Sequence, residues 1–328
     1  MAYDPTPDPA LAPFVDESRN FNQLVAAFMD QVPSFATAEG LDALRANDGF
    51  FASGEVEAVE LRDLPGPAGP VPARVLVPDQ VDAVLLDLHG GGWCIGSAQS
   101  GDTTNWELAQ ATNVAVVSID YRLAPEHPFP AGPDDCEAAA RWLLEHAATE
   151  FGTDRLLIGG SSAGAHLAAL TLLRIRDRLG ADAIDRFLGA NLVFGAYDLG
   201  MTATQRTADD ALVIPLAMLE ACFAHFLPGL DREARRDPSY SPLYADLQDL
   251  VPALFTVGTL DPLHDDSLFM AARWAAAGNA TDLRVYPESV HGFPAFPTEM
   301  GRAARDHMQA WLRARVAPDR EPSPSSSI

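Results

Sequence analysis

Short apolar segments alternate with longer helical patterns over most of the chain. The segments predicted as strands are AVLLDLH (83–89), VAVVSID (114–120), RLLIGG (155–160), ANLVFGA (190–196), ALFTVG (253–258) and LRVYPE (283–288). Helical patterns follow at 134–150, 163–180, 265–278 and 302–316. Strands that alternate with helices of this length predict an α/β fold with a mostly parallel central sheet and helices on both faces. In such sheets, reactive side chains collect just after the carboxyl ends of the strands.

The remaining segments predict how the chain is divided. Residues 1–50 are mostly helical in pattern, and the interval 197–245 is too long for a simple crossover and contains the helical stretch 209–227. We expect both to form a helical cap over a core made of 51–196 and 246–316, because lids are a common use of such insertions. The core begins with two strands around the turn PGPAGP. The Pro- and Ser-rich tail 317–328 is predicted to be disordered.

Charge and cysteine content exclude several classes of function. The formal net charge is −24, so nucleic acid and anionic membranes would be repelled. Cys94, Cys136 and Cys222 are odd in number and far apart, which fits neither a disulfide framework nor a zinc site and favours the reducing cytoplasm. The first residues lack the pattern of a signal peptide, and no apolar run reaches the length of about 18 residues that a membrane span requires.

The stretch GGSSAG contains two adjacent serines, of which one fits a known catalytic turn. Gly160, Ser162 and Gly164 match G-x-S-x-G, whereas a frame on Ser161 would put Ala163 at the last glycine. This motif places the serine at the apex of a sharp strand-to-helix turn, where flanking side chains would collide. The amide of Ala163 would then face a developing oxyanion. Alone, the motif also fits a Gly/Ser-rich turn that merely begins a helix.

A second glycine-rich segment, HGGGW, follows the strand at 83–89. Glycine costs about 0.5–1 kcal/mol in ordered elements, so stability does not explain a run of three. The run instead allows the backbone to approach a ligand closely, and the amides of Gly91 and Gly92 are candidates to join Ala163 as oxyanion donors. A phosphate-binding loop is the alternative, but G-x-G-x-x-G is not matched, since Ile95 stands where its last glycine belongs.

A base and an orienting acid also follow predicted strands. His291 lies in the short loop after the strand at 283–288, and Asp261 comes directly after the strand at 253–258. The chain order Ser162, Asp261, His291 is the order of an α/β-hydrolase triad. Asp265 and Asp266 are predicted to cap the following helix. We interpret His166 as structural, because it lies one helical turn after Ser162, and His89 as a brace for the glycine loop.

These motifs, with DYRLAPEHPFPA (120–131), DPLHD (261–265) and HGF (291–293), together resemble the hormone-sensitive-lipase-like family of α/β-hydrolases, the bacterial family IV esterases. The resemblance covers roughly residues 80–315. It implies a triad of Ser162, Asp261 and His291 and an oxyanion hole of Gly91, Gly92 and Ala163. It also implies hydrolysis of carboxylic esters with short acyl chains, no cofactor or metal, and a homodimer.

Some residues depart from the family pattern or are assigned less directly. Ser161 stands where the family usually has Asp or Thr, Ala165 where a further glycine is common, and His264 where Arg is frequent; these bear on substrate rather than mechanism. Arg122 and Glu126 are predicted to brace their loop as a pair. The predicted substrate pocket is lined by Trp93, Tyr197, Val213, Ile214 and Phe293.

The same machinery leaves two other functions open. One is a hydrolase of amides, formamides or lactones, because only the pocket distinguishes these substrates from esters. The other is a ligand receptor without catalytic activity, which would be expected to have lost a member of the triad. Serine carboxylesterase activity on a small-molecule ester is the function that the sequence favours.

Overall fold

The structure is a computed structural model, and it describes residues 4–46 and 54–317. The predicted disordered tail lies outside the described residues from position 318 onward. Within the described residues, no helix is both long enough and apolar enough to cross a bilayer.

An eight-stranded sheet forms the centre of the molecule, in the order β1-β2-β4-β3-β5-β6-β7-β8. The hairpin β1–β2 and its pairing with β4 are antiparallel, whereas all pairings from β4 to β8 are parallel. The strands are β1 (Val59–Gly66), β2 (Gly69–Leu76), β3 (Ala83–Leu88), β4 (Val114–Ile119), β5 (Leu156–Ser161), β6 (Phe187–Val193), β7 (Ala253–Gly258) and β8 (Thr281–Tyr286). The predicted fold class is therefore confirmed.

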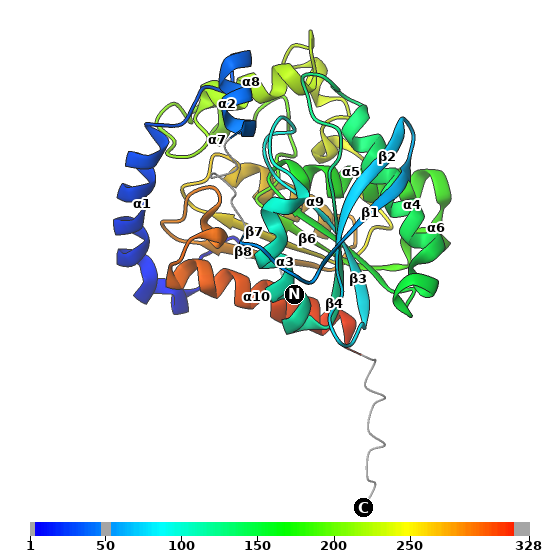
Figure 1. Cartoon of the computed structure of the whole chain (residues 1–328). Coiled ribbons are helices and arrows are strands. Elements are labelled where there is room, and N and C mark those ends of the chain that lie inside the picture. The colour runs from blue at the N-terminus through cyan, green and yellow to red at the C-terminus, as the bar shows by residue number, and fades with distance from the viewer. Residues whose placement is uncertain (1–3, 47–53, 318–328) are drawn as a thin grey trace, which may run out of the picture.

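Helices cover both faces of this sheet (Figure 1). One face packs against α4 (Ala131–Phe151), α5 (Ala163–Leu179) and α9 (His264–Ala276) in the largest apolar cluster. The other face packs against α3 (Asp102–Thr112) and α10 (Glu299–Val316) in a second cluster. The central strands are mostly apolar on both sides, as expected for a parallel sheet buried between two helical layers.

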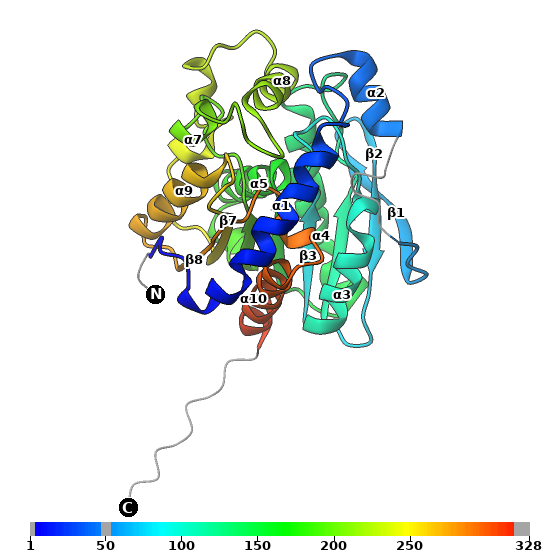
Figure 2. The same ribbon diagram turned by 90° about the vertical axis from the view of Figure 1, so that its left-hand side faces the viewer.

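The remaining helices lie around one end of the sheet. Helices α2 (Ala38–Ala46), α7 (Ala203–Arg206) and α8 (Leu216–Phe226) gather at the top of Figure 1, and α1 (Val15–Met29) crosses the side that faces the viewer in Figure 2. The cap boundaries given above stay a prediction. The short helices are η1 (Pro9–Phe14), η3 (Ala98–Gly101), α6 (Ala181–Ile184), η4 (Ala234–Arg236), η5 (Pro242–Tyr244) and η6 (Phe293–Ala295).

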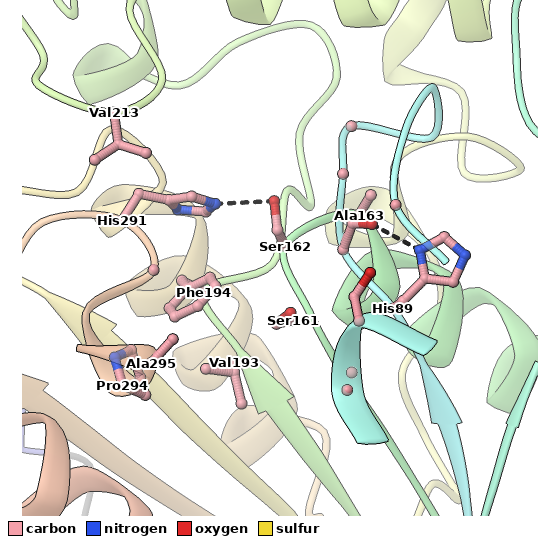
Figure 3. A pocket seen from close by; sticks show the side chains of 18 of the residues that line it. His89, Ser161, Ser162, Ala163, Val193, Phe194, Val213, His291, Pro294 and Ala295 are labelled. Atoms are coloured by element: carbon pink, nitrogen blue, oxygen red, sulfur yellow. Dashed lines mark hydrogen bonds between the residues drawn. The ribbon is translucent and has the colours of Figure 1, made fainter. Parts of the chain in front are cut away.

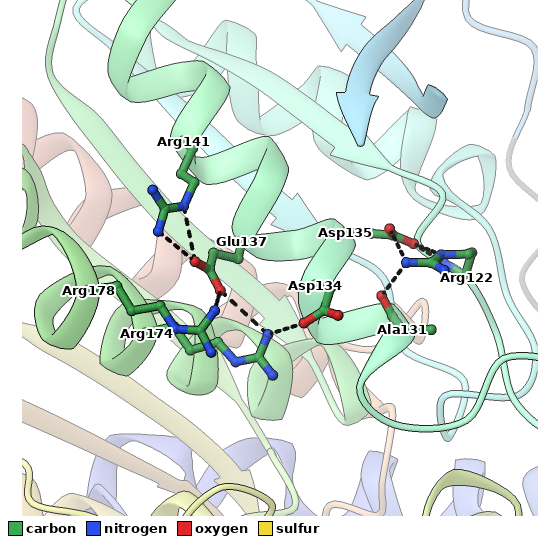
Figure 4. Close-up of polar contacts among 8 residues, drawn as sticks. All are labelled: Arg122, Ala131, Asp134, Asp135, Glu137, Arg141, Arg174 and Arg178. Atoms are coloured by element: carbon green, nitrogen blue, oxygen red, sulfur yellow. Dashed lines mark hydrogen bonds and ion pairs between the residues drawn. The ribbon is translucent and has the colours of Figure 1, made fainter. Parts of the chain in front are cut away.

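Ion pairs fasten α4 to α5 on the outer side of the first helical layer (Figure 4). Glu137 of α4 accepts hydrogen bonds from Arg141 and Arg178, and Arg174 lies 3.6 Å from the same carboxylate. Because Glu137 is buried, these guanidinium groups compensate a charge that would otherwise be costly to hide. The network keeps α5 fixed against the sheet, and α5 begins directly after Ser162.

The predicted pairing of Arg122 with Glu126 is wrong. Arg122 instead makes a bidentate contact with Asp135 at 2.8 Å, and Glu126 accepts hydrogen bonds from Arg45 of α2. Each residue still braces its loop, but each does so by tying it to a different helix.

Candidate active site

Ser162 lies at the apex of the turn between β5 and α5. Its backbone has φ 56° and ψ −119°, a strained conformation that only a tightly constrained turn maintains. The glycines on either side make this turn sterically feasible. A Cβ atom at Gly160 would lie 2.4 Å from the carbonyl oxygen of Leu88, and a Cβ at Gly164 would lie 1.9 Å from the same atom. The G-x-S-x-G pattern therefore reflects close packing of this turn against the end of β3.

Three side chains from different loops form a continuous hydrogen-bonded chain. The hydroxyl of Ser162 donates to Nε2 of His291 at 3.0 Å (Figure 3). Nδ1–H of His291 donates to Oδ2 of Asp261 at 2.9 Å. The other carboxylate oxygen of Asp261 accepts from the amide of Leu263 at 2.8 Å. Asp261 and His291 are both buried. The structure thus brings together the three residues that the sequence indicated, in the geometry of a nucleophile, a base and an orienting acid.

The glycine loop after β3 lies beside Ser162. Gly91 and Gly92 have φ values of 116° and 58°, which favour glycine. A Cβ at Gly91 would lie 2.1 Å from the carbonyl oxygen of Ile95, and a Cβ at Gly92 would lie 2.6 Å from Sγ of Cys222. Within the part of the chain that the structure describes, the amides of Gly91, Gly92 and Ala163 have no hydrogen-bond partner. These three donors are available to a ligand.

Aromatic and histidine side chains hold this loop in place. Nδ1–H of His89 donates to the carbonyl of Gly90, and the hydroxyl of Tyr121 donates to the carbonyl of His89. Trp93 stacks on Phe226, with ring centroids 4.7 Å apart. Its indole N–H also donates to Nδ1 of His166 at 3.1 Å.

His166 is consequently neutral in the folded protein. Its Nε2–H donates to the carbonyl of Tyr240, while Nδ1 accepts from Trp93, so both ring nitrogens are occupied. Burial lowers the pKa of His166 to about 4. The prediction that His166 is structural agrees with these contacts.

Helix α2 is attached to the same loop through Arg45. The guanidinium donates to the carbonyls of Cys94 and Ala124 and to the carboxylate of Glu126, all at 2.8–2.9 Å. The hydrogen bond from Arg45 lowers the pKa of Glu126 to about 2. Motif reasoning did not identify Arg45, because its partners lie about 50 to 80 positions away and are mostly backbone atoms.

A cavity of about 680 Å³ opens beside Ser162. Trp93, Val213 and Ile214, which the sequence placed in the pocket, line it. Tyr197 and Phe293 do not. The ring of Tyr197 is buried and packs against Phe255 in the core, and Phe293 packs against Tyr286 beneath the His291 loop. Both follow strand ends closely, but their side chains turn inward to the core and not toward the serine.

The prediction that Asp265 and Asp266 cap the following helix is wrong: α9 begins after Leu263 without a side-chain cap, and Asp265 accepts from the amide of Thr204. The carboxylate of Asp266, in the first turn of α9, instead accepts from the amides of Tyr197 and Asp198 and from the side chains of Thr202 and Gln205. Burial raises the pKa of Asp266 to about 7. The residue joins the segment after β6, which leads into α7 and α8, to the helix that follows Asp261.

Comparison with known proteins agrees with this geometry. Residues 85–295 match the family model described as the alpha/beta hydrolase fold. Carboxylesterase NlhH of Mycobacterium tuberculosis is 33% identical over 87% of this chain and 92% of its own. Ethyl acetate hydrolase of Pseudomonas putida is 34% identical over 68% of this chain and 71% of its own. The solved structure of a hormone-sensitive lipase from a metagenome library superposes with a TM-score of 0.78 at 30% identity, covering 92% of this chain and 98% of that one.

The fold and the match define the class: the chain belongs to the α/β-hydrolase fold family. Within that class it belongs to the hormone-sensitive-lipase-like group of carboxylesterases, the bacterial family IV esterases.

Proposed function

We propose that Ser162, His291 and Asp261 are the catalytic residues of a serine carboxylesterase that hydrolyses short-chain esters through an acyl-enzyme. The observation that carries this assignment is the unbroken hydrogen-bonded chain from Ser162 Oγ through His291 to Asp261, beside three unpaired backbone amides.

The first half of the reaction forms the acyl-enzyme. Nε2 of His291 takes the proton from Ser162 as the hydroxyl oxygen attacks the ester carbonyl carbon, and Asp261 stabilises the resulting imidazolium. The amides of Gly91, Gly92 and Ala163 hold the oxyanion. Removal of one such donor typically costs about 2.7–4 kcal/mol of transition-state stabilisation. The imidazolium then protonates the departing alcohol.

The second half releases the acid. His291 takes a proton from a water molecule, which attacks the acyl carbonyl, and the proton then returns to Ser162 as the acid leaves. Ser162 stands at the apex of a strained turn that packs closely against Leu88, which favours a fixed position of its Oγ in both halves.

A panel of p-nitrophenyl esters from acetate to decanoate, with wild type and Ser162→Ala, tests this proposal. We expect turnover by wild type only, falling as the acyl chain lengthens. Turnover of N-formyl amides or lactones without any ester hydrolysis would replace the substrate class. Saturable ligand binding by wild type without turnover of any of these compounds would refute the catalytic assignment and favour a receptor.

We further propose a homodimer and a cytoplasmic location, which the family resemblance and the cysteines support. β8 stands at the end of the strand order and is paired only with β7 in the described sheet, so it offers an edge to a second copy. The three cysteines are free and buried, as a reducing compartment permits. A mass of one chain by light scattering would contradict the dimer, and recovery of the protein outside the cytoplasmic fraction would contradict the location.

A further inference from the structure

Polar residues form a row across the centre of the sheet, on the face that α3 and α10 cover. Ser118 of β4 pairs with Asp87 of β3, Asp87 pairs with Gly159 of β5, and Gly159 pairs with Asn191 of β6. Side chains at paired positions of neighbouring strands point to the same face. The row therefore presents a carboxyl, a hydroxyl and an amide around a glycine in a layer that is otherwise apolar.

Asp87 is only partly used by its protein neighbours. Asn105 Nδ2 and Ser118 Oγ both donate to Oδ2 of Asp87, at 2.9 and 2.7 Å. Among the described residues, Oδ1 has no partner. Burial raises the pKa of Asp87, as expected for a carboxyl that an apolar layer surrounds. Asp87 is partly buried and lines the cavity, so its second oxygen is accessible to a ligand.

Asn191 supplies a second, independent sign of a missing partner. Its side chain is 7% exposed, and its Oδ1 is buried with no hydrogen-bond partner in the described part of the chain. Its Nδ2 contacts only the sulfur of Met308, at 3.6 Å. An unsatisfied buried acceptor costs about 1–3 kcal/mol. Because the Met308 side chain is unbranched and adaptable, a bound group can displace it and reach this oxygen.

The cavity of the catalytic serine extends to this row. Asp87, Gly159 and Asn191 line the same cavity as Ser162 and His291. Gly159 fits closely between its neighbours in the row, because a Cβ atom there would lie 2.9 Å from the carbonyl oxygen of Asn191. Ser161, one residue before the nucleophile, also borders the cavity and lies two positions along β5 from Gly159, a separation of about 6.6 Å.

The residues that line the cavity fall into two groups, which we call its upper and lower arms. The upper arm is the apolar group, with Val25, Phe35, Val213, Ile214, Leu219 and Phe223. The lower arm carries the polar row, together with Thr104 and Asn105 of α3 and Arg305 and Gln309 of α10.

The chemistry of the lower arm favours a neutral hydrogen-bond donor. Two of its atoms are unpaired, the carboxyl oxygen Oδ1 of Asp87 and the amide oxygen Oδ1 of Asn191. Both accept hydrogen bonds. Arg305 keeps its positive charge, because its Nη1 donates only to the neutral carbonyls of Pro294 and Phe296, and this charge disfavours a cationic donor in the arm. A hydroxyl group suits this arm whatever the protonation of Asp87, because it both donates and accepts.

We propose that the lower arm is a specificity site for a hydroxyl group at the far end of the substrate, held by Asp87 and Asn191. This inference rests on the proposed esterase function and adds the substrate class to it: esters with an apolar group on one side of the carbonyl carbon and a hydroxyl-bearing chain on the other. Asp87 acts as a specificity residue and takes no part in the chemical steps.

Matched ester pairs test the site. Because the row lies about 6.6 Å along the strand from Ser161, a six-carbon chain is chosen to reach it. The first pair varies the acyl group and compares p-nitrophenyl 6-hydroxyhexanoate with p-nitrophenyl hexanoate. The second pair varies the alcohol and compares 6-hydroxyhexyl butyrate with hexyl butyrate. In one of the two pairs, wild type should prefer the hydroxylated ester by about tenfold in kcat/KM, the value of one hydrogen bond to a charged or polar group.

Two variants of Asp87 and a control complete the experiment. Asp87→Leu should invert the preference for the hydroxylated ester. The isosteric Asp87→Asn keeps an acceptor for Ser118 and Asn105, so it should fold like wild type and lose only part of that preference. Val213→Thr, which adds a hydroxyl to the upper arm, should leave the ratio unchanged. If Asp87 were merely a structural tie between β3, β4 and α3, its variants would lower the melting temperature and leave the hydroxyl ratio at the wild-type value.

Binding separates this inference from the proposed function. Calorimetry on Ser162→Ala with the members of both ester pairs needs no turnover. In one pair the hydroxylated ester should bind about tenfold more tightly, and Asp87→Leu in the same background should abolish the difference. Equal affinities in both pairs, or a difference that survives Asp87→Leu, would overturn the inference even in an active esterase. A binding preference for the hydroxylated ester without ester hydrolysis by wild type would keep the site and reject the function.

Discussion

Gly92→Ala tests whether the glycine loop is held against the cap as closely as the structure shows. Gly92 has φ 58°, and a Cβ atom there would lie 2.6 Å from Sγ and 3.3 Å from Cβ of Cys222 on α8. Both the backbone and the space are therefore unfavourable for alanine. The loop must shift away from α8, or α8 must shift away from the loop.

The expected cost has two parts. A left-handed backbone costs a residue with a side chain about 1–2 kcal/mol. Overpacking against Cys222 adds about 1–3 kcal/mol. If the loop moves to relieve the contact, the amide of Gly92 leaves the position it needs for the oxyanion, and kcat falls by about 10²–10³-fold, which is the usual effect of losing one donor.

Two further variants separate these parts. Gly152→Ala has a similar backbone, φ 74°, but no atom within 4 Å of its Cβ and no contact with the site, so it should lose only the backbone part of the stability and retain full activity. Gly92→Ala combined with Cys222→Ala removes the sulfur and should regain part of the lost kcat. Urea unfolding and p-nitrophenyl butyrate hydrolysis measure both effects. Wild-type kcat in Gly92→Ala, or a double variant no better than the single one, would refute this reasoning.

Two other expectations concern the triad and the support of the glycine loop. Asp261→Asn should lower kcat by about 10⁴-fold with unchanged circular dichroism, because an amide no longer favours the tautomer that His291 needs; a loss of less than tenfold in p-nitrophenyl butyrate hydrolysis would show that Asp261 does not orient the base. The buried His166, with its pKa lowered to about 4, takes up a proton near pH 6.5 in the unfolded chain but only near pH 4 in the folded one. Its contribution to stability is therefore complete above pH 6.5 and is lost as the pH falls to 4, by about 3 kcal/mol. Urea unfolding at pH 7 and pH 4 should show a smaller pH dependence in His166→Gln than in wild type, and equal dependences would argue against a neutral His166.

The site was predictable where its requirements are local. Gly160 and Gly164 flank Ser162 because side chains there would strike Leu88, so the constraint appears in the sequence as a fixed spacing. Asp261 and His291 could be chosen because each directly follows an apolar strand, and strand ends meet at one edge of a parallel sheet.

Other features depend on information that a local pattern does not contain. β6 ends at Val193, three residues before the predicted end, because the chain turns at Phe194 with φ 38°. The predicted helix 209–227 begins only at Leu216, since Pro215 before it has an extended backbone. Helix α3 was not predicted, because its apolar residues are few and weakly periodic. The row containing Asp87 requires the register of four strands, which no single segment reveals.

The attachment of α1 to the loop before His291 bears on when a growing chain becomes an enzyme. Asn22 donates to the carbonyl of Glu288, and Arg19 pairs with the carboxylate of the same residue, so a wall of the cavity is fastened by contacts that span about 270 positions. During synthesis the helix leaves the ribosome early but has nothing to dock on until the last strand has emerged. The wall of the cavity that α1 forms is therefore expected to be completed only after β8 and the loop that follows it have been synthesised.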